Sequence, residues 1–277
     1  MSGVSAIPTL RRMRPLLGTL VEIGIFRPDA RAAEAVSAAF EEVSRVHRLM
    51  SFQSPGSELS RLNLAGGRRV GLSGLTLRAL RLARTMTSRS GGLFNFTLGG
   101  ALIARGRLPD HDGSVSLVAG HADDVEIDAG GARLKRPVRV TLDGIAKGLA
   151  VDRALARIRQ RGIRDAWVNA GGDLRVMGRE DLPVRMRGDG SGFLLRNGAM
   201  AASANARRFD ASLPGEILDS CGHAPVGEWC VLATSAWRAD ALTKVAALAD
   251  PASRDELLRR LGGRLVTVSL AHDARAA

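Results

Sequence analysis

The hydrophobic positions of the chain follow two different periods. Val21, Ile23 and Ile25 alternate with other residues, which is typical of a strand with one buried face. Apolar residues recur at helical spacing between positions 29 and 50 and again between 73 and 90, so both ranges are predicted to form amphipathic helices. Because strands and helices are mixed along the chain, the pattern predicts an α+β fold in which antiparallel sheets are flanked by helices.

Residues 140–154 join the two periods in one short stretch. A strand that ends at Leu142 is predicted to run into Asp143-Gly144, and an amphipathic helix follows up to Gly162. The first N–H groups of a helix have no acceptor within the helix and attract anions, so this turn could hold a phosphate or diphosphate. On the plainer interpretation, Asp143 only caps the helix and Gly144 only makes the turn. The stretch alone leaves both interpretations open.

Two strand pairs are predicted on either side of this helix. Residues 125–128 are expected to pair with residues 134–142, and residues 166–178 are expected to form a hairpin around a glycine turn. Asn169 and Asp173 flank the glycines of that turn. In such a hairpin these two residue types commonly satisfy only nearby backbone groups.

A helix near the C-terminus carries the other candidate chemistry. It is predicted to begin after a Ser235 cap and to bring Asp240, Thr243 and Lys244 onto one face, because these residues are three and four positions apart. A carboxylate beside a hydroxyl suits a hard cation such as Mg²⁺, which binds through few protein oxygens and through substrate phosphates. The alternative is a plain ion pair between Asp240 and Lys244, which stabilises a surface helix by only about 0.2–0.5 kcal/mol.

The composition narrows the range of partners. The chain has 277 residues and a net charge of +12, but its arginines are scattered, and only 4% of its residues are aromatic. Without a basic run or aromatic side chains for stacking bases, we expect no nucleic-acid partner, whereas an anionic small substrate remains compatible. Lysine occurs only as Lys135, Lys147 and Lys244, and two of these three lie in the stretches described above.

Targeting signals are not expected in this sequence. An arginine cluster followed by apolar residues near the N-terminus imitates a signal peptide, but Glu22 interrupts the apolar run and the alternation is that of a strand. Cys221 and Cys230 have neither the number for a disulfide framework nor the spacing of a metal motif. We therefore expect a cytoplasmic protein without membrane insertion, formed by residues 1–277 as a single domain.

Six short stretches are spread over most of the chain. They are residues 17–19 (Leu-Gly-Thr), 50–63 (Met-Ser and Ser-Glu-Leu-Ser-Arg-Leu-Asn), 91–99, 144–148 (Gly-Ile-Ala-Lys-Gly), 168–173 (Val-Asn-Ala-Gly-Gly-Asp) and 239–242 (Ala-Asp-Ala-Leu). Each stretch alone says little, but in this order the sequence resembles the flavin transferases of the ApbE type, the FAD:protein FMN transferases.

The resemblance implies both a fold and an activity. It implies an ApbE-like fold, an enzyme that transfers FMN from FAD to a Ser or Thr hydroxyl of a target flavoprotein with release of AMP, and Mg²⁺ at the diphosphate. Asp240 and Thr243 are implied to be catalytic and, with the backbone oxygen of Gly144, to bind the metal. Positions implied to bind the flavin nucleotide are Leu17, Phe52, Gln53, Leu93, Phe94, Asn95, Thr141, Asp143, Lys147 and Ile217.

The sequence also departs from the pattern of this family. The family usually has Tyr, Asp, Asp and Thr where this chain has Gln53, Asn95, Thr141 and Lys244. An ammonium at position 244 would repel Mg²⁺ or take over part of its role by pairing with the diphosphate. The family's histidine before the Ile217 stretch is missing, and nothing in the sequence places His223 there. The alternative function is therefore a catalytically degenerate FAD-binding or scaffold protein of the same fold.

Overall fold

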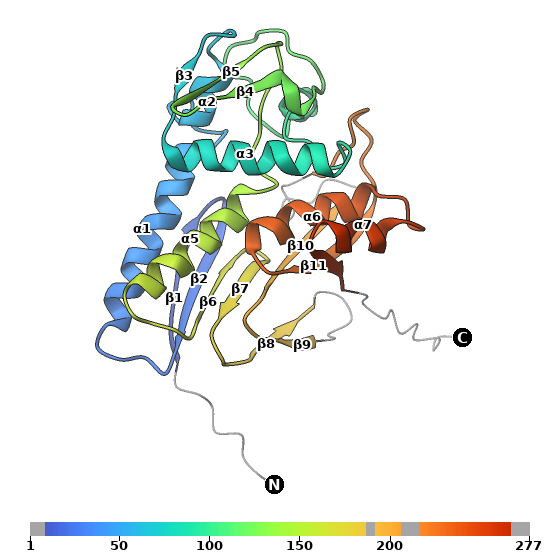
Figure 1. Cartoon of the computed structure of the whole chain (residues 1–277). Helices are drawn as coiled ribbons and strands as arrows, with labels where there is room; N and C mark the ends of the chain where they lie inside the picture. The colour runs from blue at the N-terminus through green and yellow to red at the C-terminus, as the bar shows by residue number, and fades with distance from the viewer. Residues whose placement is uncertain (1–8, 187–191, 206–215, 267–277) are drawn as a thin grey trace.

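The computed structural model describes residues 9–186, 192–205 and 216–266. In this part of the chain a seven-stranded sheet has the order β1-β2-β6-β7-β10-β11-β12, and all its neighbouring strands are antiparallel (Figure 1). Its strands are β1 (Thr9–Leu16), β2 (Thr19–Phe26), β6 (Ala166–Ala170), β7 (Asp173–Met177), β10 (Ala199–Asn205), β11 (Gly227–Ala233) and β12 (Gly263–Leu265). The alternation predicted for β2 is confirmed, because Val21, Ile23 and Ile25 are fully buried.

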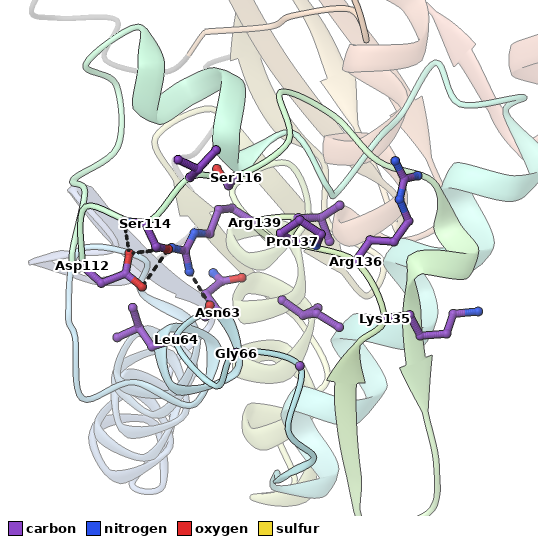
Figure 2. A pocket seen from close by; sticks show the side chains of 14 residues that line it. Asn63, Leu64, Gly66, Asp112, Ser114, Ser116, Lys135, Arg136, Pro137 and Arg139 are labelled. Atoms are coloured by element: carbon purple, nitrogen blue, oxygen red, sulfur yellow. Dashed lines mark hydrogen bonds and ion pairs between the residues drawn. The ribbon is translucent and has the colours of Figure 1, made fainter.

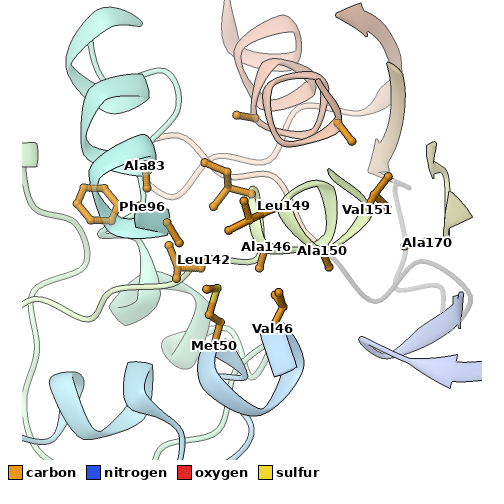
Figure 3. Packing of buried hydrophobic residues seen from close by; sticks show 14 of the residues in the cluster. Val46, Met50, Ala83, Phe96, Leu142, Ala146, Leu149, Ala150, Val151 and Ala170 are labelled. Carbon is orange, nitrogen blue, oxygen red and sulfur yellow. The ribbon is translucent and has the colours of Figure 1, made fainter. Parts of the chain in front are cut away.

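Three helices cover one face of this sheet. They are α1 (Ala32–Met50), α5 (Ala146–Gln160) and α6 (Ala236–Leu248), and the short α7 (Arg254–Arg260) follows α6 and leads into β12 (Figure 1). Helix α5 packs against both α1 and α6. Figure 3 shows Leu149 and Ala150 of α5 in the core, with Val46 and Met50 of α1 nearby. Helix α5 therefore lies between α1 and α6 and packs against both.

A smaller layer lies beyond the upper end of α1 in Figure 1. It contains α2 (Glu58–Asn63), β3 (Val70–Gly71), α3 (Gly74–Arg89), α4 (Gly99–Ala104), the 3₁₀ helix η1 (Ala122–Asp124), β4 (Val125–Ile127) and β5 (Gly131–Leu134). Ser57 caps α2 and Ser73 caps α3, since each side-chain oxygen accepts an N–H three residues later. Residues of this layer, including Leu59 and Leu80, belong to the same hydrophobic cluster as Ile23 of the central sheet.

The opposite face of the central sheet has its own apolar cluster. Trp167 and Val176 contribute to it, and the hairpin β8 (Leu182–Arg185) to β9 (Gly192–Leu195) packs there through Val184 and Phe193. In β6, Trp167 points to this face while Val168 belongs to the helix-covered core. This arrangement confirms the predicted α+β fold with antiparallel sheets and flanking helices. No helix in the described ranges is both long and apolar enough to cross a membrane.

The predicted pairing of residues 125–128 with Leu134 is confirmed by β4 and β5, but the predicted strand beyond Leu134 is wrong, because β5 ends there. Residues 138–142 are buried, and Arg139 forms an isolated parallel bridge with Leu98 instead of pairing with β4. The side-chain amide of Asn63 donates to the carbonyl of Val140 (2.8 Å), and its oxygen accepts the N–H of Val140 (2.7 Å). A side chain 77 residues earlier thus replaces the expected strand partner.

The two predicted helix caps around the site also differ from the structure. Helix α5 begins at Ala146 without a side-chain cap, so Asp143 is not its N-cap. Ser235 occupies the N-cap position of α6 but makes no capping hydrogen bond with its side chain. The carboxylate of Asp152 on α5 accepts the first two N–H groups of α6 instead, each at 3.0 Å. Helix α6 is therefore fixed to α5 at its positive end.

Candidate active site

A cluster of charged side chains lies where the start of α5, the β6–β7 turn and α6 meet. Asp143 and Lys147 come from the start of α5, Asp173 is the first residue of β7, and Asp240 and Lys244 lie on α6. These five groups interact electrostatically with one another. The two lysines are the ones that stand out in the sequence, and both face carboxylates.

Asp240 and Lys244 form the closest pair of the cluster. The Nζ atom of Lys244 donates to Oδ1 of Asp240 at 2.6 Å, to the Asp240 carbonyl at 3.2 Å and to the Ser203 hydroxyl at 3.2 Å. Oδ2 of Asp240 accepts the backbone N–H of Gly148 at 3.3 Å. Burial opposes the ionisation of Asp240, but the ammonium groups of Lys244 and Lys147 outweigh it and lower the pKa of this carboxyl.

The hydroxyl of Thr243 is engaged within the protein. It donates to the carbonyl of Asp240 at 2.7 Å and lies 2.8 Å from the hydroxyl of Ser203 on β10. Both Asp240 and Thr243 are fully buried. The predicted shared face of Asp240, Thr243 and Lys244 therefore exists, and it is directed at β10.

Lys147 and Asp173 form the second pair, on the α5 side of the cluster. Nζ of Lys147 lies 3.4 Å from Oδ2 of Asp173, and within the described part of the chain that oxygen has no hydrogen-bond partner. Burial and the negative charge of Asp240 raise the pKa of Asp173 to about 7. The carboxylates around Lys147, with Asp173 foremost, raise the pKa of its ammonium, so Lys147 is charged at neutral pH.

Gly144, just before α5, lies beside the Lys244 side chain of α6. A Cβ atom at this position would lie 3.0 Å from the ring of Phe94 and 3.3 Å from Cε of Lys244, so the absence of a side chain lets these groups approach. The N–H of Asp143 donates to the hydroxyl of Thr141 at 3.3 Å, while the Asp143 side chain is exposed. The structure thus brings together the predicted residues Phe94, Thr141, Asp143, Gly144, Lys147, Asp240 and Thr243.

Two further predicted residues line a neighbouring cavity. Leu93 and Asn95 face a cavity of about 390 Å³, with Asp219 on another part of its wall. The side chain of Asn95 is already bound, because its amide donates to the carbonyl of Gly120 (3.0 Å) and its oxygen accepts the Thr97 N–H (2.9 Å). Its first role is therefore to shape the loop.

The remaining predicted residues are not seen in contact with the charged cluster. Phe52 is buried in the core, with its ring stacked on His111, whereas Gln53 is exposed. Leu17 lies in the β1–β2 turn with a positive φ of 58° and is half-buried. The backbone of Ile217 is held at both its N–H and carbonyl by the side chain of Asn205, at 2.9 and 2.8 Å.

His223 does not replace the missing histidine in this structure. Its side chain is 84% exposed, and its Nδ1 atom lies 3.2 Å from Oδ2 of Asp219. The carboxylate of Asp219 also accepts the backbone N–H groups of Cys221 and His223. The pair therefore stabilises its own turn.

A second cavity, of about 460 Å³, lies between α2 and residues 134–139 (Figure 2). Arg139 reaches into its wall, where its guanidinium donates to the carbonyl of Asn63, to the Ser114 hydroxyl and to Asp112 at 2.5 Å. Since the described wall holds none of the predicted site residues, this cavity is separate from the charged cluster. The guanidinium of Arg139 is hydrogen-bonded within the protein, so its role is structural.

Sequence reasoning missed three residues of the site. Asp173 flanks the double-glycine turn, but nothing local shows that its carboxylate is buried beside Lys147. Ser203 lies among small residues and becomes relevant only when β10 packs on α6. Asp152 reads as an ordinary helix residue, and its capping of α6 depends on the contact between two helices 84 residues apart.

The model of the ApbE family matches residues 17–267 of this chain. The chain therefore belongs to the ApbE family. A protein from Rhodobacter capsulatus named FAD:protein FMN transferase is 34% identical to it over 179 residues, which are 59% of this chain and 34% of that protein. The aligned part thus spans about a third of the length of this relative.

Solved structures of ApbE proteins share the fold. The ApbE protein from Thermotoga maritima matches with a TM-score of 0.82 at 23% identity, covering 93% of both chains. The flavinyl transferase ApbE from Pseudomonas stutzeri, in its apo form, matches with a TM-score of 0.78 at 18% identity over 93% of this chain and 91% of that chain. The flavin transferase ApbE from Vibrio cholerae gives 0.77 at 18% identity over 95% and 98%. These matches establish an ApbE-like fold.

Proposed function

We propose that this chain is a FAD:protein FMN transferase, which moves FMN from FAD to a Ser or Thr hydroxyl of an acceptor flavoprotein and releases AMP. The observation that carries the proposal is the pair of ammonium groups in one cluster, Lys147 on α5 and Lys244 on α6, with the Lys244 side chain beside Gly144. Two ammonium groups near the positive end of a helix form a suitable environment for a diphosphate. The name of the relative from Rhodobacter capsulatus supports the same activity.

The proposed reaction is a single phosphoryl-type transfer. The oxygen of the acceptor hydroxyl attacks the phosphorus of the FMN phosphate and forms a new P–O bond. The bond from this phosphorus to the bridging oxygen of the diphosphate breaks, and AMP leaves with the bridging oxygen. Since positioning and charge neutralisation supply most of the catalysis in such transfers, fixed ammonium groups are the main requirement.

The residues of the cluster have different roles in this proposal. Asp143 is the exposed carboxylate among the described groups of the cluster, so we assign to it the proton of the attacking hydroxyl. Asp240 and Thr243 are buried and act by positioning Lys244 and β10. Phe94, beside Gly144, is the aromatic residue suited to contact the flavin nucleotide near its diphosphate.

The roles of the other binding residues, the cellular location and the kinds of partner stay predictions from the sequence. These residues are Leu17, Phe52, Gln53, Leu93, Asn95, Thr141 and Ile217. Of these, Leu93 and Asn95 are the best placed, since they line the cavity of about 390 Å³. A cytoplasmic location, without membrane insertion and without a nucleic-acid partner, is part of the same proposal.

The magnesium ion implied by the resemblance does not fit the donor set as it stands. Oδ1 of Asp240 is taken by Lys244, and the Thr243 hydroxyl donates to a backbone carbonyl. The reaction above accordingly uses only groups of the chain.

The test is the mass of an acceptor protein after incubation with FAD and this protein. We expect the intact mass of a flavin-acceptor domain to increase by one FMN unit and AMP to appear in equal amount. The Lys147→Met variant should lose this activity, whereas Lys135→Met, which changes an exposed lysine outside the cluster, should keep it.

The alternative function is a degenerate FAD-binding or scaffold protein, favoured by the neutral Thr141 and Asn95 and by the pairing of Lys244. FAD binding without any mass gain of the acceptor would refute the transferase and support this alternative. Absence of FAD binding would refute the transferase and the FAD-binding form of the alternative, and would leave a scaffold protein.

A further inference from the structure

We propose that the ammonium of Lys244 is a built-in cation of this site, so that the chain binds the FAD diphosphate without a divalent metal ion. The inference rests on the proposed function, because it concerns the same diphosphate. It assigns to Lys244 a binding role that sets this chain apart from the pattern it otherwise resembles.

The first support is the set of oxygen atoms around Nζ of Lys244. A lysine ammonium has three N–H donors. Here they have three oxygen acceptors: the carboxylate of Asp240 at 2.6 Å, the carbonyl of Asp240 at 3.2 Å and the hydroxyl of Ser203 at 3.2 Å. A carboxylate, a carbonyl and a hydroxyl are also ligands of a hard cation, so the ammonium already sits in an oxygen site.

The second support is that the neighbouring oxygen atoms are engaged. The hydroxyl of Thr243 donates to the Asp240 carbonyl and is in contact with Ser203. The second carboxylate oxygen of Asp240 accepts the N–H of Gly148. An ion entering here would have to displace the ammonium and leave it without its charged partner.

The third support is the space around the lysine side chain. Its Cε atom lies 3.3 Å from the Cβ position of Gly144, on the same side as the Phe94 ring at 3.0 Å. Apolar groups therefore fill the volume beside Gly144, whereas Mg²⁺ binds with several water molecules around it. The lysine side chain is 19% exposed, and a ligand at its ammonium would compete for the N–H donors that the Ser203 hydroxyl and the Asp240 carbonyl accept at 3.2 Å.

Lys244 and Lys147 are the two ammonium groups of the site. Three carboxyl groups, of Asp143, Asp173 and Asp240, lie in the same cluster, so the proposed role of Lys244 rests on the fixed position of its ammonium and not on a net positive charge. Asp240 is fully buried, so its negative charge fixes Lys244 at this position. The ammonium is thus held in place before any ligand binds.

The experiment measures FAD affinity of the full chain by flavin fluorescence, once in EDTA and once with MgCl₂. For the unchanged protein we expect dissociation constants that agree within about twofold, and no heat of Mg²⁺ binding by calorimetry in the absence of FAD. For Lys244→Thr we expect affinity in EDTA to fall about tenfold or more, with recovery when Mg²⁺ is added. Lys135→Thr should behave like the unchanged protein in both media.

Each outcome separates the inference from the proposed function. If the unchanged protein binds FAD only with Mg²⁺, or binds Mg²⁺ alone, the role of Lys244 is refuted while the transferase proposal stands. Retention of full affinity by Lys244→Thr in EDTA refutes it as well. If FAD binds in neither medium, the proposed function itself fails. Should Lys244→Thr fail to fold by circular dichroism, the comparison of the two media on the unchanged protein still decides.

Discussion

Replacing Gly148 by Ala tests the close packing of α5 against α6. A Cβ atom at this position would lie 2.3 Å from the carbonyl oxygen of Ala236, 2.5 Å from its carbonyl carbon and 2.6 Å from Cα of Trp237. These are backbone atoms of α6, so the helix itself must move. Overpacking of this kind costs about 1–3 kcal/mol, and the rigid obstacle favours the upper end. Alanine gains up to about 1 kcal/mol over glycine inside a helix. We therefore expect a net loss of about 2 kcal/mol in the free energy of unfolding.

The assay is equilibrium unfolding in urea, followed by tryptophan fluorescence and by circular dichroism. Gly74→Ala is the matched control, because Gly74 begins α3 and no atom lies within 4 Å of its Cβ position. This control should leave the stability unchanged or raise it by up to about 1 kcal/mol. If Gly148→Ala unfolds at the same urea concentration as Gly74→Ala, the reasoning on the α5–α6 contact is refuted.

Three further predictions concern the charged groups. Asp152→Ala should lower the free energy of unfolding by about 1–2 kcal/mol, because α6 loses its cap. Ser235→Ala should change it by less than about 0.5 kcal/mol, because the Ser235 side chain makes no capping hydrogen bond. Urea unfolding of the two variants measures both changes. The folded-state pKa of Asp173 is raised to about 7, so its protonation favours the folded state and stability falls as pH rises from about 4 to about 7. Asp173→Asn should flatten this slope in thermal unfolding and raise the Tm more at pH 8 than at pH 5, and an unchanged slope would contradict it. The pKa of Glu216 is lowered by Arg105, so this pair stabilises the fold above the usual carboxyl pKa and is lost in acid. Glu216→Gln should therefore lower the Tm at pH 7 but much less at pH 3.

Local signals in the sequence predicted much of the fold correctly. The helix predicted between positions 73 and 90 is confirmed as α3, and its cap, Ser73, is adjacent in the chain to the helix that it begins. The alternation in residues 21–25 was sufficient for β2, since one face of the strand is buried by helices. The shared face of Asp240 and Lys244 follows directly from helical spacing.

The errors arise where distant segments supply the partners. Val140 lies in an extended segment, yet its hydrogen bonds go to the side chain of Asn63 and not to a strand. The N–H groups of α6 are capped by Asp152 and not by the adjacent Ser235. The burial of Asp173 likewise depends on the packing of β7 under α5, which no local pattern encodes.

The connection between α5 and α6 has a consequence for the order of events during synthesis. A chain still attached to the ribosome and ending before Ala236 already contains Lys147 and Asp173, but it contains neither Lys244 nor the helix that Asp152 caps. Such a chain therefore has the residues of the Lys147–Asp173 pair but lacks those of the Lys244–Asp240 pair. Lys244 is added only when α6 has been synthesised and packs on β10 and β11. On the proposed function, a diphosphate can therefore contact both ammonium groups only after α6 has been synthesised.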